Sequence, residues 1–466
     1  MKKIGLIVLV MVFALSFSVQ AGVSTGKDVA SAREITINGS FDNTMVSRDS
    51  GVTSVLDCVP KPGKQASDLF WSPLITLNLG IDVGDKVTAL VQLQNRRLDA
   101  AIGTAANVDF FGGDNIEMAV EQAYVQVEKL IIDELTFKYG GQNLKFAVRE
   151  NGDAFFMDTN NSRTMNLPYT EANIYKVVGG IAKDTCEFGG ARFDYGSLKN
   201  NNYKVSFYWG VVNESLAGRT DERITGLVGW YKVPGGDPRN TATATVSKTF
   251  NEGTKLDIQT IGVGGNYFGA MPDLELYGEY YTQSGDFATG IDQSSSAYRL
   301  GGKYDIKNPA LKPYIDVSYW YLSGGGTTTK NKNFMSYENV QSTLILEDNI
   351  WGLDIDSNYK VLKMEAGLTQ QLDIEKDGTP EPLDVKLIFG TFSLVADPAT
   401  KTAGQTVSKN LGTEIDVVAT LHFNKNLSFT LGYAKLTGGD FFTSTGGYGV
   451  KSSGMQMIVL DSKLKF

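Results

Sequence analysis

Apolar and polar residues alternate with a period of two along most of this chain. In the stretch WSPLITLNLGID (residues 71–82) the apolar positions Ile75, Leu77 and Leu79 fall on one side of an extended chain. Polar Thr76 and Asn78 fall on the other side. The run KVTALVQLQNRR (86–97) repeats the alternation after the turn signal DVGD, so the two runs predict a β-hairpin. No long segment has the three- and four-residue spacing of an amphipathic helix.

The same pattern recurs from end to end and predicts about 18 strands, with 16 to 20 as the range. The segment DVKLIFGTFSLV (384–395) is a further candidate that the hairpin series does not place. The predicted strands span residues 35–41, 71–82, 86–97, 121–128, 134–142, 189–198, 203–212, 223–232, 241–250, 258–268, 274–281, 298–306, 313–322, 351–359, 361–369, 413–423, 427–436 and 456–466.

Short links alternate with long polar connections between these strands. The long connections are rich in Gly, Ser, Thr and Asn, and they span Asn43–Leu69, Ala101–Glu117, Arg149–Thr170, Ser323–Asn349 and Gly439–Met455. Tight turns on one side and extended external loops on the other are typical of outer-membrane barrels. The fold class is therefore predicted to be all-β, a transmembrane antiparallel β-barrel, and the absence of a linker predicts a single barrel domain over residues 22–466.

The residues on the second face of the strands distinguish a membrane barrel from a soluble exported β-protein. A soluble sandwich buries its apolar faces against each other, whereas a barrel turns them to lipid and keeps a polar lumen. Here the second face mixes charges, amides, hydroxyls, Gly and Tyr, as in Glu275, Tyr277, Glu279 and Tyr281. That mixture suits a water-filled wall, and Gly within the strands is expected to allow bends and close packing.

The two ends of the chain indicate its location. Residues 1–21 combine MKK, an apolar stretch and the small-x-small pattern Val19–Ala21, which predicts a cleaved signal peptide. The run QMIVLDSKLKF (456–466) is expected to be the closing strand, pairing with the first strand near residues 35–41. Its inner face carries Met457 and Val459, which are expected to pack against a loop folded inside. The expected location is the outer membrane, with lipid as one partner and the barrel-assembly machinery, which reads the Phe466 strand, as another.

Composition and charge narrow the function classes. Without Lys2 and Lys3, 41 basic residues stand against 52 acidic ones, a net charge near −11. Such a chain is a poor nucleic-acid binder. After residue 21 no apolar run approaches the roughly 18 residues of a transmembrane helix. Of the two cysteines, Cys58 and Cys186, a disulfide and two unpaired thiols both stay open.

Catalysis has little support in the sequence. The single histidine, His422, shares a strand face with Glu414, Asp416 and Thr420, and it is interpreted as a polar wall residue rather than a proton shuttle. No second histidine is available for a metal site, and no G-x-S-x-G motif occurs. The chain is therefore expected to be no enzyme, with no metal and no cofactor.

Several polar side chains are candidates for the lining of a channel. Arginines can select anionic solutes through bidentate contacts, and salt bridges between loops are the alternative reading. Glutamates and the overall acidity point instead to a preference for cations. The candidate lining residues are Gln92, Gln94, Arg96, Arg97, Lys138, Gln142, Arg149, Glu275 and Glu279.

About a third of the chain resembles porins of the alginate export family. The similar segments are ALVQLQNRRLD, VEQAYVQVEKL, LTFKYGGQNLKF and the tail from LGTEIDVVATLHF onward. The resemblance implies an 18-stranded monomeric barrel through which solutes diffuse. The strand here reads KYGGQ where the family's polyanion transporter has a GRQ form, and the chain is acidic, so a general or differently selective channel is expected rather than one for alginate.

The leading hypothesis is thus a porin, a passive water-filled channel for small hydrophilic solutes with long extracellular loops. A structural or adhesive barrel with a plugged lumen is the first alternative, and a barrel hydrolase is the second. The transported solute, its charge and the oligomeric state stay open at this stage.

Deletion of Phe466 tests the interpretation of the closing strand. We expect the truncated chain to insert into outer membranes less efficiently while its ion selectivity stays unchanged, because the terminal aromatic would mark the strand for assembly. The fraction of heat-modifiable, membrane-inserted protein measures this. Insertion equal to that of the full chain would refute the interpretation.

Overall fold

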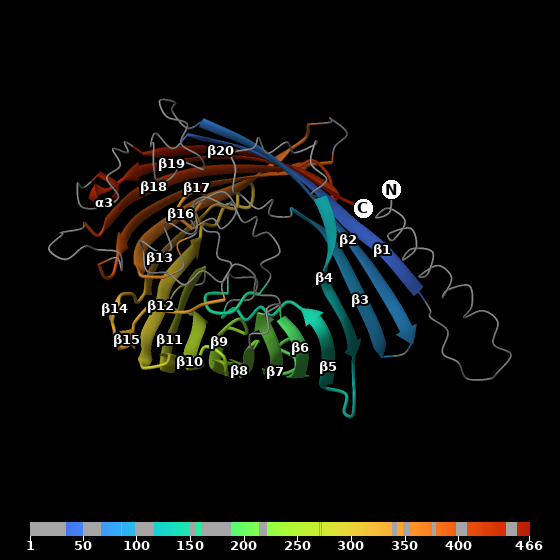
Figure 1. Ribbon diagram of the computed structural model, residues 1–466. Helices are drawn as coiled ribbons and strands as arrows, with labels where there is room; N and C mark the ends of the chain where they lie inside the picture. Colours follow the sequence, from blue (N-terminus) through green and yellow to red (C-terminus); the bar gives the residue numbers. More distant parts are fainter. Residues whose placement is uncertain are drawn as a thin grey trace.

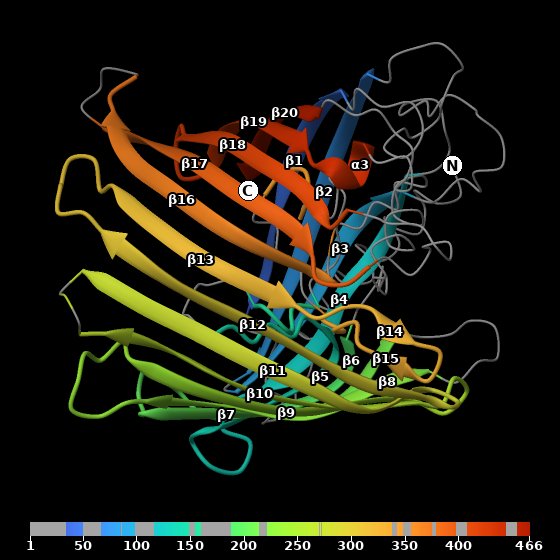
Figure 2. The same cartoon turned by 90° about the vertical axis from the view of Figure 1, so that its left-hand side faces the viewer.

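A computed structural model describes most of the chain beyond its first 33 residues. The described residues are 34–49, 67–84, 86–97, 116–148, 154–159, 188–213, 221–269, 271, 273–337, 343–347, 355, 357–374, 379–397, 408–443 and 454–466. Within these ranges, 18 strands (β1–β13 and β16–β20) form one closed antiparallel ring, in which each strand pairs with the next along the chain. Figures 1 and 2 show the ring in two views. The predicted fold class and strand number are confirmed.

The ring strands carry the following bounds. They are β1 (Glu34–Asp49), β2 (Ser67–Gly84), β3 (Val87–Arg97), β4 (Ile116–Val127), β5 (Leu135–Gln142), β6 (Phe188–Gly196), β7 (Tyr203–Asn213), β8 (Glu222–Lys232), β9 (Thr241–Asn251), β10 (Leu256–Phe268), β11 (Leu274–Ala288), β12 (Ile291–Asp305), β13 (Tyr314–Leu322), β16 (Tyr359–Leu372), β17 (Glu381–Leu394), β18 (Asn410–His422), β19 (Leu427–Gly438) and β20 (Met455–Lys465).

Three short elements lie between ring strands. Strands β14 (Gly326–Thr327) and β15 (Lys330–Asn331) form a short hairpin, of which β15 pairs in parallel with β12. The helix α3 (Asp440–Thr443) follows β19. No helix in the described ranges is long and apolar enough to cross a membrane.

The ring closes where the last strand meets the first. Strand β20 pairs with β1 from Ser40 opposite Lys465 to Asp49 opposite Gln456. Beyond the ladder, Gly39 and Phe466 exchange two backbone hydrogen bonds of 2.9 and 3.0 Å. The predicted pairing of the closing strand is confirmed, and its hydrogen bonds leave neither β1 nor β20 as an open edge.

The two faces of the wall differ as the alternation predicts. Large apolar side chains alternate outward along the strands and are exposed, for example Val246 on β9, Leu362 on β16 and Leu431 on β19. In β20 the exposed row is Ile458, Leu460, Leu464 and Phe466, as expected for the face that contacts lipid. The inward face carries buried threonines, serines, amides and charges, so the polar groups surround the lumen.

One predicted hairpin is wrong. Residues 351–359 and 361–369 were expected to form adjacent strands, but β16 begins at Tyr359 and its neighbours are β13 and β17. The unplaced candidate 384–395 is the strand β17, which pairs with both β16 and β18. Period-two alternation identifies a strand but cannot identify the strand that it pairs with. One strand too many was predicted before β16 and one ring strand, β17, was left unplaced, so the predicted number of 18 is unchanged.

Two connections predicted as external loops have described parts that fold into the lumen. From the β5–β6 connection, residues 143–148 and 154–159 lie inside the ring, where Phe155 and Phe156 are buried (Figure 1). From the β13–β16 connection, residues 332–337 and 343–347 do the same, with Phe334 buried. Phe156 lies 5.2 Å, between ring centroids, from the wall residue Tyr281. The lumen therefore contains a hydrophobic core of its own.

The expected packing of Met457 and Val459 is confirmed by this core. Met457 is 1% exposed and belongs to the same cluster as the loop residues Ile345 and Leu346. Val459 packs against the cluster. Their apolar side chains on the inner face of β20 are explained because folded-in chain, rather than water, covers that part of the wall.

Lumen-facing tyrosines lie over glycines on neighbouring strands. Tyr281 and Gly262 are direct register partners, and a Cβ built on Gly262 would come within 2.3 Å of the tyrosine ring. Tyr277 covers its partner Gly301 in the same way. Glycine leaves room for the ring to lie flat on the wall, and the ring covers backbone that glycine would expose. The expectation that strand glycines allow close packing is confirmed.

Several predicted features lie outside the described residues. These are the signal peptide 1–21, both cysteines (Cys58 and Cys186), Arg149 and the side chains of Arg96 and Arg97. The backbone of Arg96 and Arg97 belongs to β3.

Lysine substitutions on opposite faces of β18 test the assignment of the faces. Val417, at mid-strand, is exposed on the outer face, and Val417→Lys should lower the free energy of unfolding in lipid vesicles by about 2–4 kcal/mol because it places a charge in hydrocarbon. Thr420→Lys, on the inner face, should cost much less. Urea titration of the refolded variants measures both, and equal losses would contradict the assignment.

Candidate functional site: the barrel lumen

A chain of amide side chains crosses the lumen wall from β4 to β1. Gln122 donates to Gln92 (2.9 Å), Gln92 donates to Asn78 (2.8 Å), and Asn78 donates to Asn38 (3.0 Å). Each amide in this chain is hydrogen-bonded to the amide on the neighbouring strand. These bonds make this part of the wall polar and hold its side chains in one arrangement. Three of these residues are half-buried and Asn38 is exposed, so they can exchange hydrogen bonds with a passing solute.

A basic arc lies on the lumen wall of β5, β6 and β7, toward the turn end of the barrel. It consists of Lys138, Arg192 and Lys204, and Lys138 and Arg192 are direct register partners. Asp194 is the carboxylate within this arc, and it forms a 3.0 Å ion pair with Arg192 and accepts a hydrogen bond from Ser206. Three cations and one carboxylate leave the arc positive.

Aromatic rings support the cations of the basic arc. The Lys138 ammonium lies 4.1 Å from the centroid of the Tyr124 ring, and the Lys204 ammonium lies 5.3 Å from that of Trp230. Cation–π contacts of this kind hold a charged side chain without neutralising it. The arc can therefore attract a negatively charged group of a solute.

An acidic arc lies on the wall from β11 to β17. Asp316 on β13 and Glu365 on β16 are direct register partners. Tyr277 donates to Asp316 (2.6 Å), and Tyr314 donates to Glu365. The arc also includes Glu275 and Asp384, with Lys303 and Lys386 as its cations, so four carboxylates stand against two lysines.

The β16–β17 part of the acidic arc faces the basic arc across the barrel. Strand β6 is the sixth of the ring and β17 is the fifteenth, so they lie half a turn of the ring apart. Figure 1 shows β6 and β7 at the bottom of the ring, with β16 and β17 on the far side. A solute between the arcs would therefore meet a field directed across the pore.

A buried ion pair lies deeper in the lumen. The Arg299 guanidinium and the Glu279 carboxylate approach to 2.5 Å, with side chains 3% and 2% exposed. The guanidinium also lies 5.2 Å from the ring centroid of Trp320 and 5.5 Å from that of Phe155 on the folded-in β5–β6 connection. The pair fixes this connection against the wall, so the predicted lining residue Glu279 is buried beneath it.

The other predicted lining residues have different surroundings. Gln94 donates to Thr76 (3.1 Å) and is buried. Gln142 is also buried and donates to the carbonyl of Gly190 (3.2 Å). Glu275 accepts from Asn266 (3.2 Å).

The structure brings only some of the predicted residues together. Lys138 belongs to the basic arc, whereas Gln92 and Gln94 follow the neighbouring wall of β3, and Glu275 and Glu279 lie on β11. A role in solute passage stays a prediction for all of them.

Sequence reasoning missed two of the three cations of the basic arc. Arg192 and Lys204 lie in predicted strands at inward positions of the alternation, so assigning faces to 189–198 and 203–212 would have found them. That they meet Lys138 depends on the register of three strands, which alternation alone does not give.

The histidine is a wall residue with a carboxylate partner. His422 Nε2 lies 2.9 Å from Asp384, which also accepts a 2.6 Å hydrogen bond from Thr369. Among the described residues, no group of three or more potential ligands could hold a metal ion.

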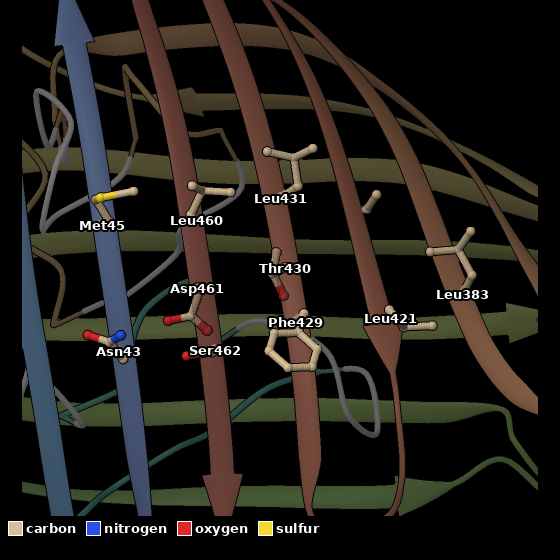
Figure 3. Close-up of a pocket in the computed structure, with 11 residues that line it drawn as sticks. Asn43, Met45, Leu383, Leu421, Phe429, Thr430, Leu431, Leu460, Asp461 and Ser462 are labelled. Carbon is tan, nitrogen blue, oxygen red and sulfur yellow. The ribbon is translucent and has the colours of Figure 1, made fainter. Parts of the chain in front are cut away.

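A hollow of about 630 Å³ lies on the outer face of the wall over β17–β20 and β1 (Figure 3). Its rim is apolar, with Met45, Leu431 and Leu460 pointing outward, while Asp461 points the other way. The hollow is on the lipid side, so it is separate from the lumen.

Comparisons with known proteins agree with this architecture. The family model described as alginate export matches residues 181–455. The solved structure of Pseudomonas aeruginosa OprD is 14% identical, with 95% of this chain and 99% of that chain covered at a TM-score of 0.50. P. aeruginosa OccK3 (OpdO) is 12% identical (93% and 96% covered, TM-score 0.50). P. aeruginosa OccK2 (OpdF), solved in complex with glucuronate, is 10% identical (93% and 98%, TM-score 0.50). These structures share the fold. A search of curated proteins found no match.

Removing one partner of the buried ion pair should destabilise the barrel. We expect Glu279→Ala to lower the free energy of unfolding by about 3–5 kcal/mol, because it leaves the Arg299 charge buried without its carboxylate. The double change Glu279→Met with Arg299→Met should recover most of the loss. Urea titration of the refolded protein measures both, and a double variant weaker than Glu279→Ala would contradict the explanation.

Proposed function

Because this chain belongs to the alginate export family of outer-membrane β-barrels, we propose that it is a porin that lets small hydrophilic solutes diffuse through its lumen. The observation that supports this proposal is the pair of oppositely charged arcs on the lumen wall, which face each other in part across the lumen. Charged side chains in a plugged, dry lumen cost stability unless they are paired, and the three cations of the basic arc share one carboxylate, Asp194.

The wall supports passage without consumption of energy. Amide and hydroxyl groups can replace part of the water shell of a solute, as the chain from Gln122 to Asn38 offers in sequence. The folded-in parts of two connections reduce the free cross-section, so passage is restricted to small solutes. Each contact is weak and repeated, which lets a solute enter and also leave.

The arcs predict weak discrimination between ions rather than strict selectivity. The basic arc favours anions, whereas the acidic arc and the net acidity of the chain favour cations. A solute that carries both charges could orient across the pore with each end toward the opposite charge.

One observation favours the alternative of a barrel with a plugged lumen. The core inside the ring includes Phe155, Phe334 and Ile345, which are buried. If this core filled the whole cross-section, no solute would pass, and the protein would act through its long connections as a structural or adhesive barrel. Complete absence of conductance would support this alternative.

For His422 we propose a structural role in the wall. Its partner Asp384 is itself held by Thr369, so the three side chains link β16, β17 and β18. We propose no hydrolytic chemistry for this group. His422→Ala should therefore leave stepwise conductance intact.

Charge reversal in the basic arc tests the proposed function. Purified protein in planar bilayers should show stepwise conductance, and Lys138→Glu with Lys204→Glu should shift the reversal potential in a salt gradient toward cation selectivity. The reason is that four negative charge units are added to one side of the lumen.

A matched control separates the lumen from net charge. Lys199→Glu with Lys425→Glu makes the same change at two turns outside the strands, and it should shift the reversal potential far less. Equal shifts for both double variants would contradict a charge filter in the lumen. No conductance from any of the proteins would refute the porin.

A further inference from the structure

The described segment 343–347 of the β13–β16 connection is attached to the lumen wall by two carboxylates. Glu414 accepts the backbone N–H groups of Ile345 (2.6 Å) and Leu346 (3.0 Å). Asp416 accepts the N–H of Leu344 (3.0 Å). Three consecutive backbone donors thus converge on two acidic side chains of one strand, β18.

The shape of the segment brings the donors together. Thr343 Oγ1 accepts the N–H of Glu347 (3.3 Å), which closes a compact turn over the five residues. Consecutive N–H groups on one side of such a turn form an anion-binding concavity. The carboxylates of β18 occupy it.

Further contacts spread the attachment over neighbouring strands. The Glu347 carboxylate lies 3.7 Å from the Lys363 ammonium and accepts a 3.2 Å hydrogen bond from Tyr359, both on β16. On β19, a Cβ added to Gly432 would come within 3.1 Å of Leu344, so the glycine leaves space for this side chain. The segment therefore covers the wall from β16 to β19 and takes up lumen that would otherwise be open.

Glu414 and Asp416 are both 0% exposed. Burying two acidic groups side by side is unfavourable by itself, and the wall gains nothing from it when a threonine or valine would pack there. Among the described residues, these two side chains hold the segment through hydrogen bonds from three of its backbone N–H groups.

We propose that Glu414 and Asp416 are the positioning residues that set the size limit of the channel, by holding segment 343–347 across part of its lumen. This proposal rests on the proposed function as a porin. It assigns the limit to a detachable segment of chain rather than to the diameter of the ring alone.

Neutral substitutions of the two carboxylates test the proposal. Glu414→Gln replaces one acceptor oxygen by an NH2 group that faces a backbone donor, and Asp416→Asn weakens the third bond. We expect each variant to raise single-channel conductance about twofold, because the freed segment leaves a wider path. Asp461→Asn is the matched control, since Asp461 is bonded to Thr44 of the wall, and its conductance should equal that of the unaltered protein.

A change in the segment itself covers the case in which a wall variant fails to fold. Leu346→Pro removes one of the two N–H groups that donate to Glu414 and leaves every strand residue in place, so the ring can assemble. Heat-modifiable electrophoretic mobility verifies assembly of each variant. Leu346→Pro should raise conductance as Glu414→Gln does.

The outcomes distinguish the two proposals. If the unaltered protein conducts and the assembled variants, Leu346→Pro included, conduct equally, the attachment does not set the size limit and the inference is overturned while the porin stands. If the unaltered protein and all variants fail to conduct, the porin itself is refuted. Larger conductance in the variants, with the Asp461→Asn control unchanged, supports the inference.

Discussion

The structure depends on one constraint, that backbone N–H and C=O groups inside a bilayer have no water to bond with. A sheet satisfies this requirement only if it has no edge, because each unpaired group in hydrocarbon costs several kcal/mol. The pairing of β20 with β1 meets it, and the bonds between Gly39 and Phe466 extend the closure to the last residue. The alternation of outward apolar and inward polar residues follows from this closed ring.

Closure leaves an interior that must be occupied by water, solute or chain. Here the folded-in segments occupy part of the interior, and each is held to the wall by different contacts. The β5–β6 segment is held by aromatic packing and the pair Arg299–Glu279, whereas 343–347 is held by Glu414 and Asp416. Toward the turn end the wall carries the two charged arcs. One ring therefore provides a narrowed region and a charged region, and the two meet where the Arg192 guanidinium lies 5.4 Å from the ring centroid of Phe146.

Local alternation was sufficient to predict most strands and the assignment of faces, because both depend on residues near in sequence. The closing pair was predicted instead from the requirement that a barrel leaves no open edge. Alternation failed for the hairpin predicted between 351–359 and 361–369, because β16 begins at Tyr359 and pairs with β13 and β17. It also could not show that 154–159 and 343–347 enter the lumen, since their contacts lie on β11, β13 and β18, far away in the chain. Lys138 was found as a lining candidate, but its neighbours Arg192 and Lys204 follow from register, which one sequence does not contain.

The proposed porin requires a continuous polar path beside the folded-in segments. Its decisive test is the swelling of liposomes that contain the purified protein, in isotonic solutions of neutral polar solutes of increasing size. An open path should give fast swelling with the smallest solutes and a steep decline as solute size increases. No swelling with any solute would refute such a path and would mean that the core closes the lumen.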